Sequence, residues 1–350
     1  MHLPISSLLC LLALVLGVTG QLKYWLDETC RHYPLPMGET LSLSPYLKEM
    51  FYMAELAKKR MLNDKDSADL RDIEFRRMYK LLFKTDLNAD SRQKYEYGLE
   101  YKEFFGLEDD SAEARDTAYN IVYNTLDSIS TTWTETENRL EADNRIYCDN
   151  GRHFSESGKD DKSVDPVNNI WTTADCESDG LYAFVTCELY DEEDEQDTDP
   201  CLLTVCDNGL QDFRYPGMSG GGTTPERPFL LSELIEEDKV TAGLPLNKHA
   251  SLVNLLFHEW SHTQPHLTED WYFGDDMDTG ATGEWKVLMD IPDTRRAVIN
   301  AEALSFIGLS ALLIEGKDAP KGHFYTMQLD YESLPNKEHP NIGKISFYDD

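Results

Sequence analysis

Two histidines and a glutamate stand within five consecutive residues, a spacing that suits metal binding and proton transfer. The segment from His258 to His262, with the sequence HEWSH, follows the uncharged and mostly apolar run 252–257, which predicts a buried helix. Residues four apart share one face of a helix, so both imidazoles can bind a single Zn²⁺. Zinc lowers the pKa of a bound water to about 7, and Glu259 can accept its proton and pass it to a leaving amine. We therefore expect His258 and His262 to be metal ligands and Glu259 to be the general base.

This spacing does not identify the third ligand. Four later residues have a suitable side chain, namely His266, Asp270, Glu284 and Glu302. Pro265 disturbs the helix just before the first of them. The two glutamates lie at distances where other zinc peptidases take a glutamate from a second helix. The residues alone leave these alternatives open.

The segment after the second histidine resembles a motif of the aspzincins, the zinc peptidases that include the deuterolysins and the peptidyl-lysine metalloendopeptidases. Residues 267–274 are similar to the family's G-T-x-D-x-x-Y-G, with matches at Thr268, Asp270 and Gly274. The resemblance implies a zincin-like fold with an HExxH active-site helix. It also implies that His258, His262 and Asp270 bind zinc. A carboxylate as third ligand leaves one coordination position open for water, as a catalytic zinc site requires.

Three further segments resemble aspzincin sequences. Residues 182–185 are similar to the A-Y-V strand that precedes the active-site helix, and residues 289–293 and 297–302 are similar to the M-D-x-D and A-V-x-N-A-D runs. The last position of the second run faces the substrate residue after the scissile bond, and in the lysine-specific branch it pairs with a substrate lysine. Glu302 occupies this position, so the resemblance makes it a substrate-binding residue. Weaker similarity extends back to Cys30, and the specific part spans residues 258–306.

One departure from the family pattern bears on catalysis. The family has a tyrosine three residues after the ligand aspartate, where it is thought to donate a hydrogen bond to the oxyanion. Phe273 occupies that position here, and Tyr272 precedes it. We expect Tyr272 to take the catalytic role. The alternative is a secreted zinc-binding protein, effector-like or allergen-like, with little or no peptidase activity; Phe273 favours it and Glu259 opposes it.

The charge of the chain restricts its partners. The 350 residues include 65 acidic and 32 basic side chains, for a net charge of -33. Binding to nucleic acid or to anionic membrane surfaces depends on Lys and Arg, so we expect neither partner. Long-range steering favours basic partners. The sequence thus predicts a protein or peptide substrate, with a preference for Lys or another basic residue after the scissile bond.

The beginning of the chain and its cysteines predict secretion. Residues 5–18 form an apolar run of about 14 residues, too short to span a bilayer and followed by small residues, so residues 1–20 are expected to be a signal peptide. Six cysteines remain in residues 21–350, and an even count predicts up to three disulfides whose pairing the sequence leaves open. We expect an extracellular monomer that makes no membrane contact after cleavage.

The pattern along the chain predicts an α+β fold that is predominantly helical and has a small β region. Residues 21–350 are expected to form one catalytic unit, with a helical half (40–145), a Cys-rich β and loop region (146–246), the zinc-site and C-terminal helices (247–318) and a tail (319–350). Apolar periodicity predicts helices over 45–62, 67–84, 111–141, 250–262 and 295–315, the second beginning at Ser67 as N-cap. Strands are expected over 181–187 and 202–206, separated by an exposed acidic loop.

Overall fold

A computed structural model describes most of the chain from Leu22 onward. The described residues are 22–35, 38–63, 66–84, 87, 112–131, 133–156, 163–177, 181–187, 200–211, 228–240, 246, 249–263, 268, 294–316, 324–328 and 344–348. The predicted signal peptide lies outside these residues. No helix among them is both long enough and apolar enough to cross a membrane.

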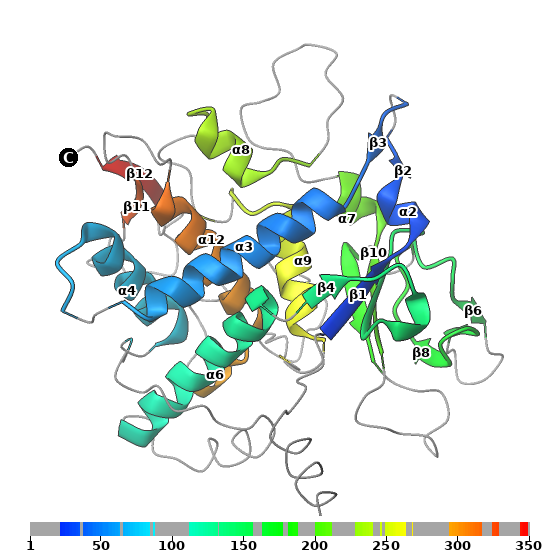
Figure 1. Cartoon of the computed structure of the whole chain (residues 1–350), viewed down its shortest axis with the longest axis horizontal. Coiled ribbons are helices and arrows are strands. Elements are labelled where there is room, and N and C mark those ends of the chain that lie inside the picture. Colours follow the sequence, from blue (N-terminus) through cyan, green and yellow to red (C-terminus); the bar gives the residue numbers. More distant parts are fainter. Residues whose placement is uncertain are drawn as a thin grey trace, which may run out of the picture.

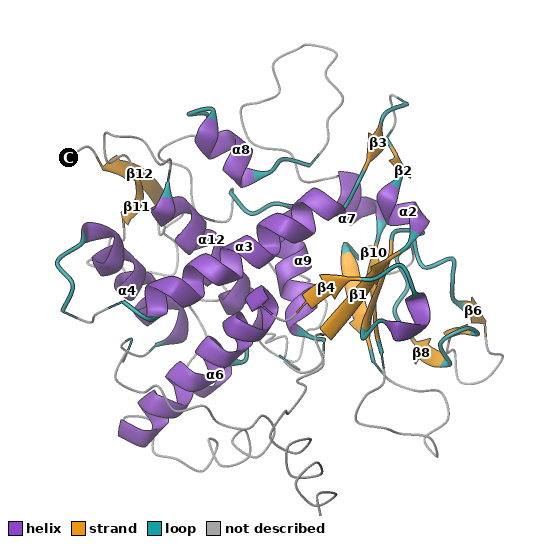
Figure 2. Ribbon diagram, in the orientation of Figure 1, coloured by secondary structure: helices purple, strands orange, loops and turns teal. Residues whose placement is uncertain are grey.

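A five-stranded mixed sheet forms one side of the molecule (Figure 2). Its strands are β1 (Leu22–Leu26), β4 (Trp133–Glu135), β5 (Asn144–Tyr147), β9 (Ala183–Thr186) and β10 (Cys201–Val205). The order is β4-β1-β5-β10-β9, and only β9, at one edge, runs antiparallel to its neighbour. Every residue of β10 is buried, as expected for a parallel strand covered on both faces. The strands predicted over 181–187 and 202–206 are thus confirmed.

The longer helices lie on one side of this sheet and pack against one another there (Figure 1). The longer ones are α3 (Ser44–Met61), α4 (Leu70–Phe83), α6 (Ala112–Thr131), α9 (Leu252–Ser261) and α12 (Ala301–Glu315). The short ones are α2 (Glu28–Arg31), α7 (Asp207–Gln211), α8 (Leu231–Glu236), α11 (Thr294–Val298) and the 3₁₀ turn η1 (Arg139–Glu141). Helix α9 lies at the centre, in contact with α3, α12 and β9. A single large hydrophobic core runs through these elements, so the α+β prediction is confirmed.

Short strands outside the main sheet form hairpins and a small sheet. They are β2 (Tyr33–Pro34) with β3 (Thr40–Leu41), β6 (Ser155–Glu156), β7 (Ser163–Asp165) and β8 (Ile170–Thr172) in a second sheet, and β11 (Phe324–Gln328) with β12 (Lys344–Tyr348). All these pairings are antiparallel. The last hairpin belongs to the segment that the sequence predicted only as a tail.

The helix predicted over 295–315 is two helices. Asn300 separates α11 from α12, because its side chain accepts a hydrogen bond from Ala303 N at 2.8 Å and so caps the second helix. Every residue of α12 is buried except Glu302 and Glu315, which are partly exposed. A helix that is apolar all round belongs in the interior of a protein, and here it separates α4 from α9.

Two other helix boundaries differ from the predicted ones. The helix predicted over 111–141 ends at Thr131, and the remaining residues form β4 and η1. The β-branched and aromatic residues around Trp133 favour a strand, and pairing with β1 provides one. Helix α4 begins later than expected because Asp69, not Ser67, is the N-cap and accepts from Arg71 N at 2.8 Å.

A buried ion-pair network joins three helices. Arg60 of α3 donates to Asp72 of α4 at 2.8 Å and to Glu315 of α12. Asn63 and Ser67 also donate to the Asp72 carboxylate, at 2.6 and 2.7 Å. Burial alone would raise the pKa of Asp72, but these hydrogen bonds and the guanidinium charge hold it below its usual range.

The six cysteines of residues 21–350 form three disulfides, as predicted. The pairs are Cys30–Cys148, Cys176–Cys206 and Cys187–Cys201, and all three lie in or beside the sheet. The third pair joins the end of β9 to the start of β10. Three disulfides are consistent with an extracellular protein.

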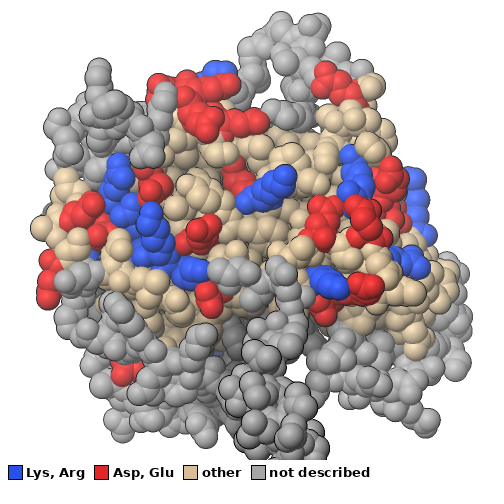
Figure 3. Space-filling model, viewed as in Figure 1, with Lys and Arg blue, Asp and Glu red and all other residues tan. Residues whose placement is uncertain are grey.

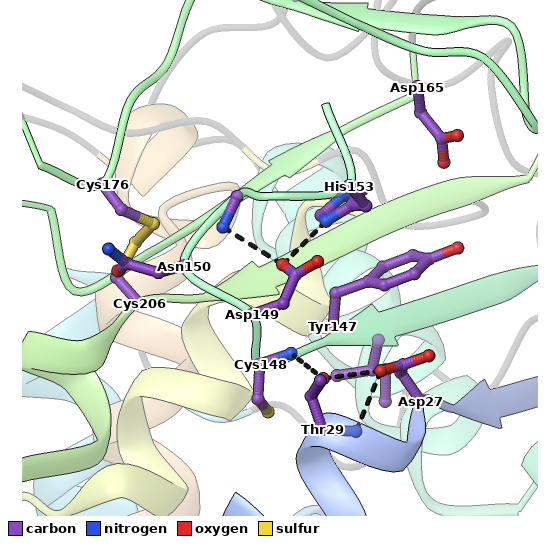
Figure 4. Close-up of polar contacts among 12 residues, drawn as sticks. Asp27, Thr29, Tyr147, Cys148, Asp149, Asn150, His153, Asp165, Cys176 and Cys206 are labelled. Atoms are coloured by element: carbon purple, nitrogen blue, oxygen red, sulfur yellow. Dashed lines mark hydrogen bonds and ion pairs between the residues drawn. A yellow bond between two sulfur atoms is a disulfide. The ribbon is translucent and has the colours of Figure 1, made fainter. Parts of the chain in front are cut away.

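Polar contacts fix the turn that follows β5 (Figure 4). His153 bonds Asp149 at 2.8 Å through Nδ1, and its ring stacks on Tyr147 with centroids 3.9 Å apart. Thr29 accepts from the Cys148 amide at 3.2 Å and so ties the turn to α2. This histidine stabilises a turn beside the sheet and belongs to a different part of the fold from the HExxH helix.

The exposed surface carries acidic side chains in several places. Figure 3 shows one such group over α8, where Glu236, Glu237 and Asp238 are exposed. Lys239 pairs with Glu237 at 2.5 Å and offsets part of this charge.

Candidate metal centre

Helix α9 is fixed at its first turn by a reciprocal pair of hydrogen bonds. The Ser251 side chain accepts from Val253 N at 3.1 Å, and the Asn254 side chain accepts from Ser251 N at 3.2 Å. These bonds satisfy amides that a helix start otherwise leaves without partners. Asn254 also donates to the Ser305 carbonyl of α12 at 3.3 Å. Helices α9 and α12 are therefore held together by a polar contact as well as by packing.

The other end of α9 is anchored to the sheet. Trp260 is fully buried and makes edge-on contacts with the rings of Tyr24, Phe51 and Trp133, at centroid distances of 5.7, 5.2 and 4.8 Å. Asn144 of β5 donates to the Thr263 hydroxyl at 2.9 Å. The side chains of a helix in such a rigid setting keep one orientation, which is what a ligand site requires.

The two predicted histidine ligands face each other at the end of this helix. The Nε2 atoms of His258 and His262 lie 3.2 Å apart, and the rings are nearly perpendicular, at 80°. His258 is buried, and His262 is only partly exposed. Glu259, between them in sequence, is buried with 7% of its surface exposed. The structure therefore brings together both histidines in the way that their spacing predicted.

Each histidine uses its other nitrogen to contact an oxygen atom. His258 Nδ1 lies 3.0 Å from Glu302 Oε2, and His262 Nδ1 lies 2.8 Å from the Thr268 carbonyl oxygen. A carbonyl only accepts hydrogen bonds, and an ionised carboxylate also only accepts, so both Nδ1 atoms are donors. In neutral rings, the two Nε2 atoms then carry lone pairs that point toward each other. A cation between them removes the resulting repulsion.

The distance between the two nitrogens suits a zinc ion. Zn–N bonds of about 2.0–2.1 Å at a tetrahedral angle place two ligand nitrogens about 3.3–3.4 Å apart. The observed 3.2 Å is close to this value. In proteins a metal-binding histidine donates its other N–H to a carboxylate or carbonyl, which is the arrangement of both rings here. The two histidines therefore fit a metal ion as neighbouring ligands.

Of the remaining predicted site residues, the structure describes only Glu302. Asp270, Tyr272 and Phe273 lie outside the described residues, as do the alternative ligands His266 and Glu284. Within the described residues there is no group of three His, Cys, Asp or Glu side chains that could hold a metal.

Glu302, predicted to bind substrate, lies against His258. Its Oε2 contacts Nδ1, on the opposite side of the ring from the paired Nε2 atoms. Its role toward a substrate stays a prediction.

Thr268 and Ser261 form a second contact at the site, to which the sequence assigned no function. The Ser261 hydroxyl donates to the His258 carbonyl at 2.7 Å, and it lies 2.7 Å from the Thr268 hydroxyl. Thr268 N donates to the Ser261 carbonyl at 3.1 Å. These bonds bring residue 268 back to the end of α9 and place its carbonyl against His262. Two hydroxyl residues seven positions apart are too common a pattern to reveal this contact in advance.

No family model matches the chain, and neither a curated protein nor a solved structure matches it. The residues and their geometry therefore carry the functional argument.

Proposed function

We propose that this protein is a secreted, monomeric, zinc-dependent endopeptidase. The observation that carries the proposal is the pair of Nε2 atoms 3.2 Å apart, with both Nδ1 atoms already bonded to oxygen acceptors. Such a pair suits zinc, and a helix with a glutamate next to the first ligand suits the hydrolytic use of zinc. The three disulfides support an extracellular location.

Asp270 is the third ligand in this proposal. Thr268 carries the carbonyl that contacts His262 Nδ1, and it is two residues before Asp270. The bonds of Thr268 hold the described part of this motif beside His262, which supports a ligand role for Asp270. A carboxylate oxygen beside two imidazole nitrogens is a ligand set that catalytic zinc sites use.

Glu259 is the proton carrier in the proposed reaction. Bound zinc supplies a Lewis acid that polarises the peptide carbonyl and makes a water molecule more acidic. The Glu259 carboxylate takes the proton from the attacking water and delivers it to the amide nitrogen that leaves. The phenol of Tyr272 donates a hydrogen bond to the developing oxyanion.

The substrate in this proposal is a protein or peptide with a basic residue after the scissile bond. The net charge of -33 attracts basic segments. The zincin-like fold is part of the same proposal. It is supported by β9, whose residues resemble the strand before the aspzincin active-site helix and which contacts α9 at the edge of the sheet.

Glu259→Gln tests the mechanism directly. The variant should bind one zinc per chain, as the wild type does, and lose peptidase activity by about 10²–10⁴-fold. Cleavage of a peptide library, mapped by mass spectrometry with and without a chelator, measures activity and specificity together. Full activity in the variant would refute the mechanism. One zinc per chain with no cleavage of any peptide by the wild type would favour the alternative of a zinc-binding protein without peptidase activity.

A further inference from the structure

The acidic residue in the first turn of α12 has a partner in another helix. Glu302 stands two residues after the N-cap Asn300, where an acidic side chain is favoured by the helix dipole alone. A side chain that served only the dipole could remain in solvent. Only 16% of the Glu302 side chain is exposed, and its Oε2 lies 3.0 Å from His258 Nδ1. The helix dipole therefore does not account for this orientation.

The backbone of α12 leaves Glu302 free to make this contact. The Asn300 side chain already accepts from Ala303 N, so the carboxylate of Glu302 is not needed as a cap. Asn254 of α9 bonds the Ser305 carbonyl, which fixes α12 beside α9 within one turn of Glu302. The two helices are thus held in the register that brings a carboxylate to the far nitrogen of a predicted metal ligand.

The two histidines differ in what holds them. His262 Nδ1 bonds the main-chain carbonyl of Thr268, a neutral acceptor that no side-chain substitution removes, and the Thr268 hydroxyl lies 3.3 Å from the same atom. His258 bonds a carboxylate, which is a stronger acceptor because it is charged. A charged acceptor at Nδ1 also makes the opposite nitrogen a better electron donor toward a metal. A side-chain substitution can therefore remove the carboxylate that His258 contacts but not the carbonyl that His262 contacts. His262 thus serves as an internal reference for changes at His258.

We propose that Glu302 is a positioning residue that keeps His258 as the Nδ1–H tautomer and aims its Nε2 lone pair at the metal position. This role rests on the proposed zinc site and differs from the substrate contact that the sequence suggested. In this role Glu302 acts through His258 and not by direct contact with the metal. Its carboxylate should strengthen zinc binding by about 10–100-fold, the usual effect of such partners.

Two substitutions separate the charge of Glu302 from its role as an acceptor. Glu302→Leu removes the acceptor and introduces an apolar side chain of similar size that suits the buried surroundings of α12. Glu302→Gln keeps an amide oxygen as acceptor and removes the charge. Glu315→Gln is the matched control, because Glu315 lies on the same helix and pairs with Arg60, away from the histidines.

Histidine tautomers can be read by long-range ¹H–¹⁵N NMR on the metal-free full chain labelled at histidine. The wild type should show Nδ1–H for both His258 and His262. Glu302→Leu should give His258 a mixed or Nε2–H tautomer and leave His262 as Nδ1–H, whereas Glu315→Gln should change neither. An unchanged His258 tautomer in Glu302→Leu would overturn the proposal.

Zinc affinity, measured by competition with a chelating dye, gives the second readout. Glu302→Gln should raise the dissociation constant by about 10–100-fold, and Glu315→Gln should leave it within about 2-fold. Should Glu302→Leu fail to fold, Glu302→Gln decides the matter, since wild-type affinity in that variant overturns the proposal. Failure of the proposed function looks different: the wild type would bind no zinc, while the His258 tautomer would still respond to Glu302→Leu and support its positioning by Glu302.

Discussion

Phe257, the residue before His258, packs against Gly308 of α12 so closely that no side chain fits between them. A Cβ atom added at Gly308 would lie 2.9 Å from Phe257 Cε2 and 3.4 Å from Met53 Cβ. Phe257 is fully buried, so its ring has little room to move. The glycine therefore sets how closely α12 approaches α9, and with it the distance between Glu302 and His258.

Gly308→Ala should destabilise the protein, against the usual trend. Alanine in a helix interior is normally favoured by about 1 kcal/mol, but overpacking of a filled core costs about 1–3 kcal/mol. We expect the free energy of unfolding to fall by about 1 kcal/mol in urea titrations. Adding Phe257→Leu should recover part of the loss, whereas Ser310→Ala, on the same helix, should not respond to that second change. A Gly308→Ala variant as stable as the wild type would show that α9 and α12 can move apart to accept a methyl group without loss of stability.

Thr268→Val should loosen the contact that holds His262. Valine keeps the shape of threonine and the main-chain carbonyl but removes the hydroxyl that lies 2.7 Å from Ser261 Oγ. Loss of this hydrogen bond should cost about 1 kcal/mol and weaken zinc binding by less than about 10-fold. Denaturation and dye competition measure the two effects. Ser310→Ala is the control, because among the described residues its hydroxyl bonds the Phe306 carbonyl of its own helix. Zinc affinity that falls equally in both variants would contradict the specific role of Thr268.

Asp72→Asn should show how the buried ion pair depends on pH. The pKa of Asp72 is lowered in the folded state, so its charge stabilises the fold above the unfolded pKa of about 4, and this contribution is lost as pH falls through the lower folded value. At pH 7 the variant should be less stable by about 1–3 kcal/mol, since the buried Arg60 loses its charged partner at Asp72 and keeps the one at Glu315.

Urea unfolding at pH 7 and pH 3 tests this prediction. The difference between wild type and Asp72→Asn should shrink at the lower pH. Asp127→Asn, at a half-exposed pair with Lys58, should change stability by no more than about 1 kcal/mol at either pH. A difference that stayed constant with pH would assign the effect to packing.

Zinc should raise the melting temperature through the two histidines. A ligand at 1,000 times its dissociation constant stabilises the folded state by about 4 kcal/mol, and a chelator should reverse the gain. His262→Ala should lose this response. His32→Ala removes an exposed histidine at the end of α2, 3.2 Å from Glu28, and should keep the response. Differential scanning calorimetry with and without zinc makes the comparison, and an equal gain in both variants would place the metal elsewhere.

Local patterns predicted α9 well and the sheet poorly. The helix has an apolar run, an N-cap and a spacing of four between histidines, all within a dozen residues. Strand β1, in contrast, pairs with β4 and β5, more than 100 residues away, and no local signal announces such pairing. Its five residues, LKYWL, do not alternate strictly between polar and apolar side chains, so their local pattern does not mark them as a strand.

The candidate site likewise contains residues that local patterns predicted and contacts that only the fold creates. His258, Glu259 and His262 could be found because one helix carries them. The sequence predicted Glu302 as a substrate-binding residue by resemblance and as an alternative metal ligand, but its contact with His258, 44 residues earlier, depends on how α12 packs against α9. Thr268 contributes a main-chain carbonyl, and carbonyls are the same at every residue, so its place in the site required the structure.

The positions of the disulfides along the chain have a consequence for biosynthesis. All six bridged cysteines precede α9, and the Cys30–Cys148 bridge alone encloses α3, α4 and α6. A polypeptide that emerges from the ribosome with its N-terminus first can therefore begin to form these bridges before α9 and α12 have emerged. The proposed zinc binding would then be the later event, because it needs α9 and α12 to have docked onto a framework that is already crosslinked.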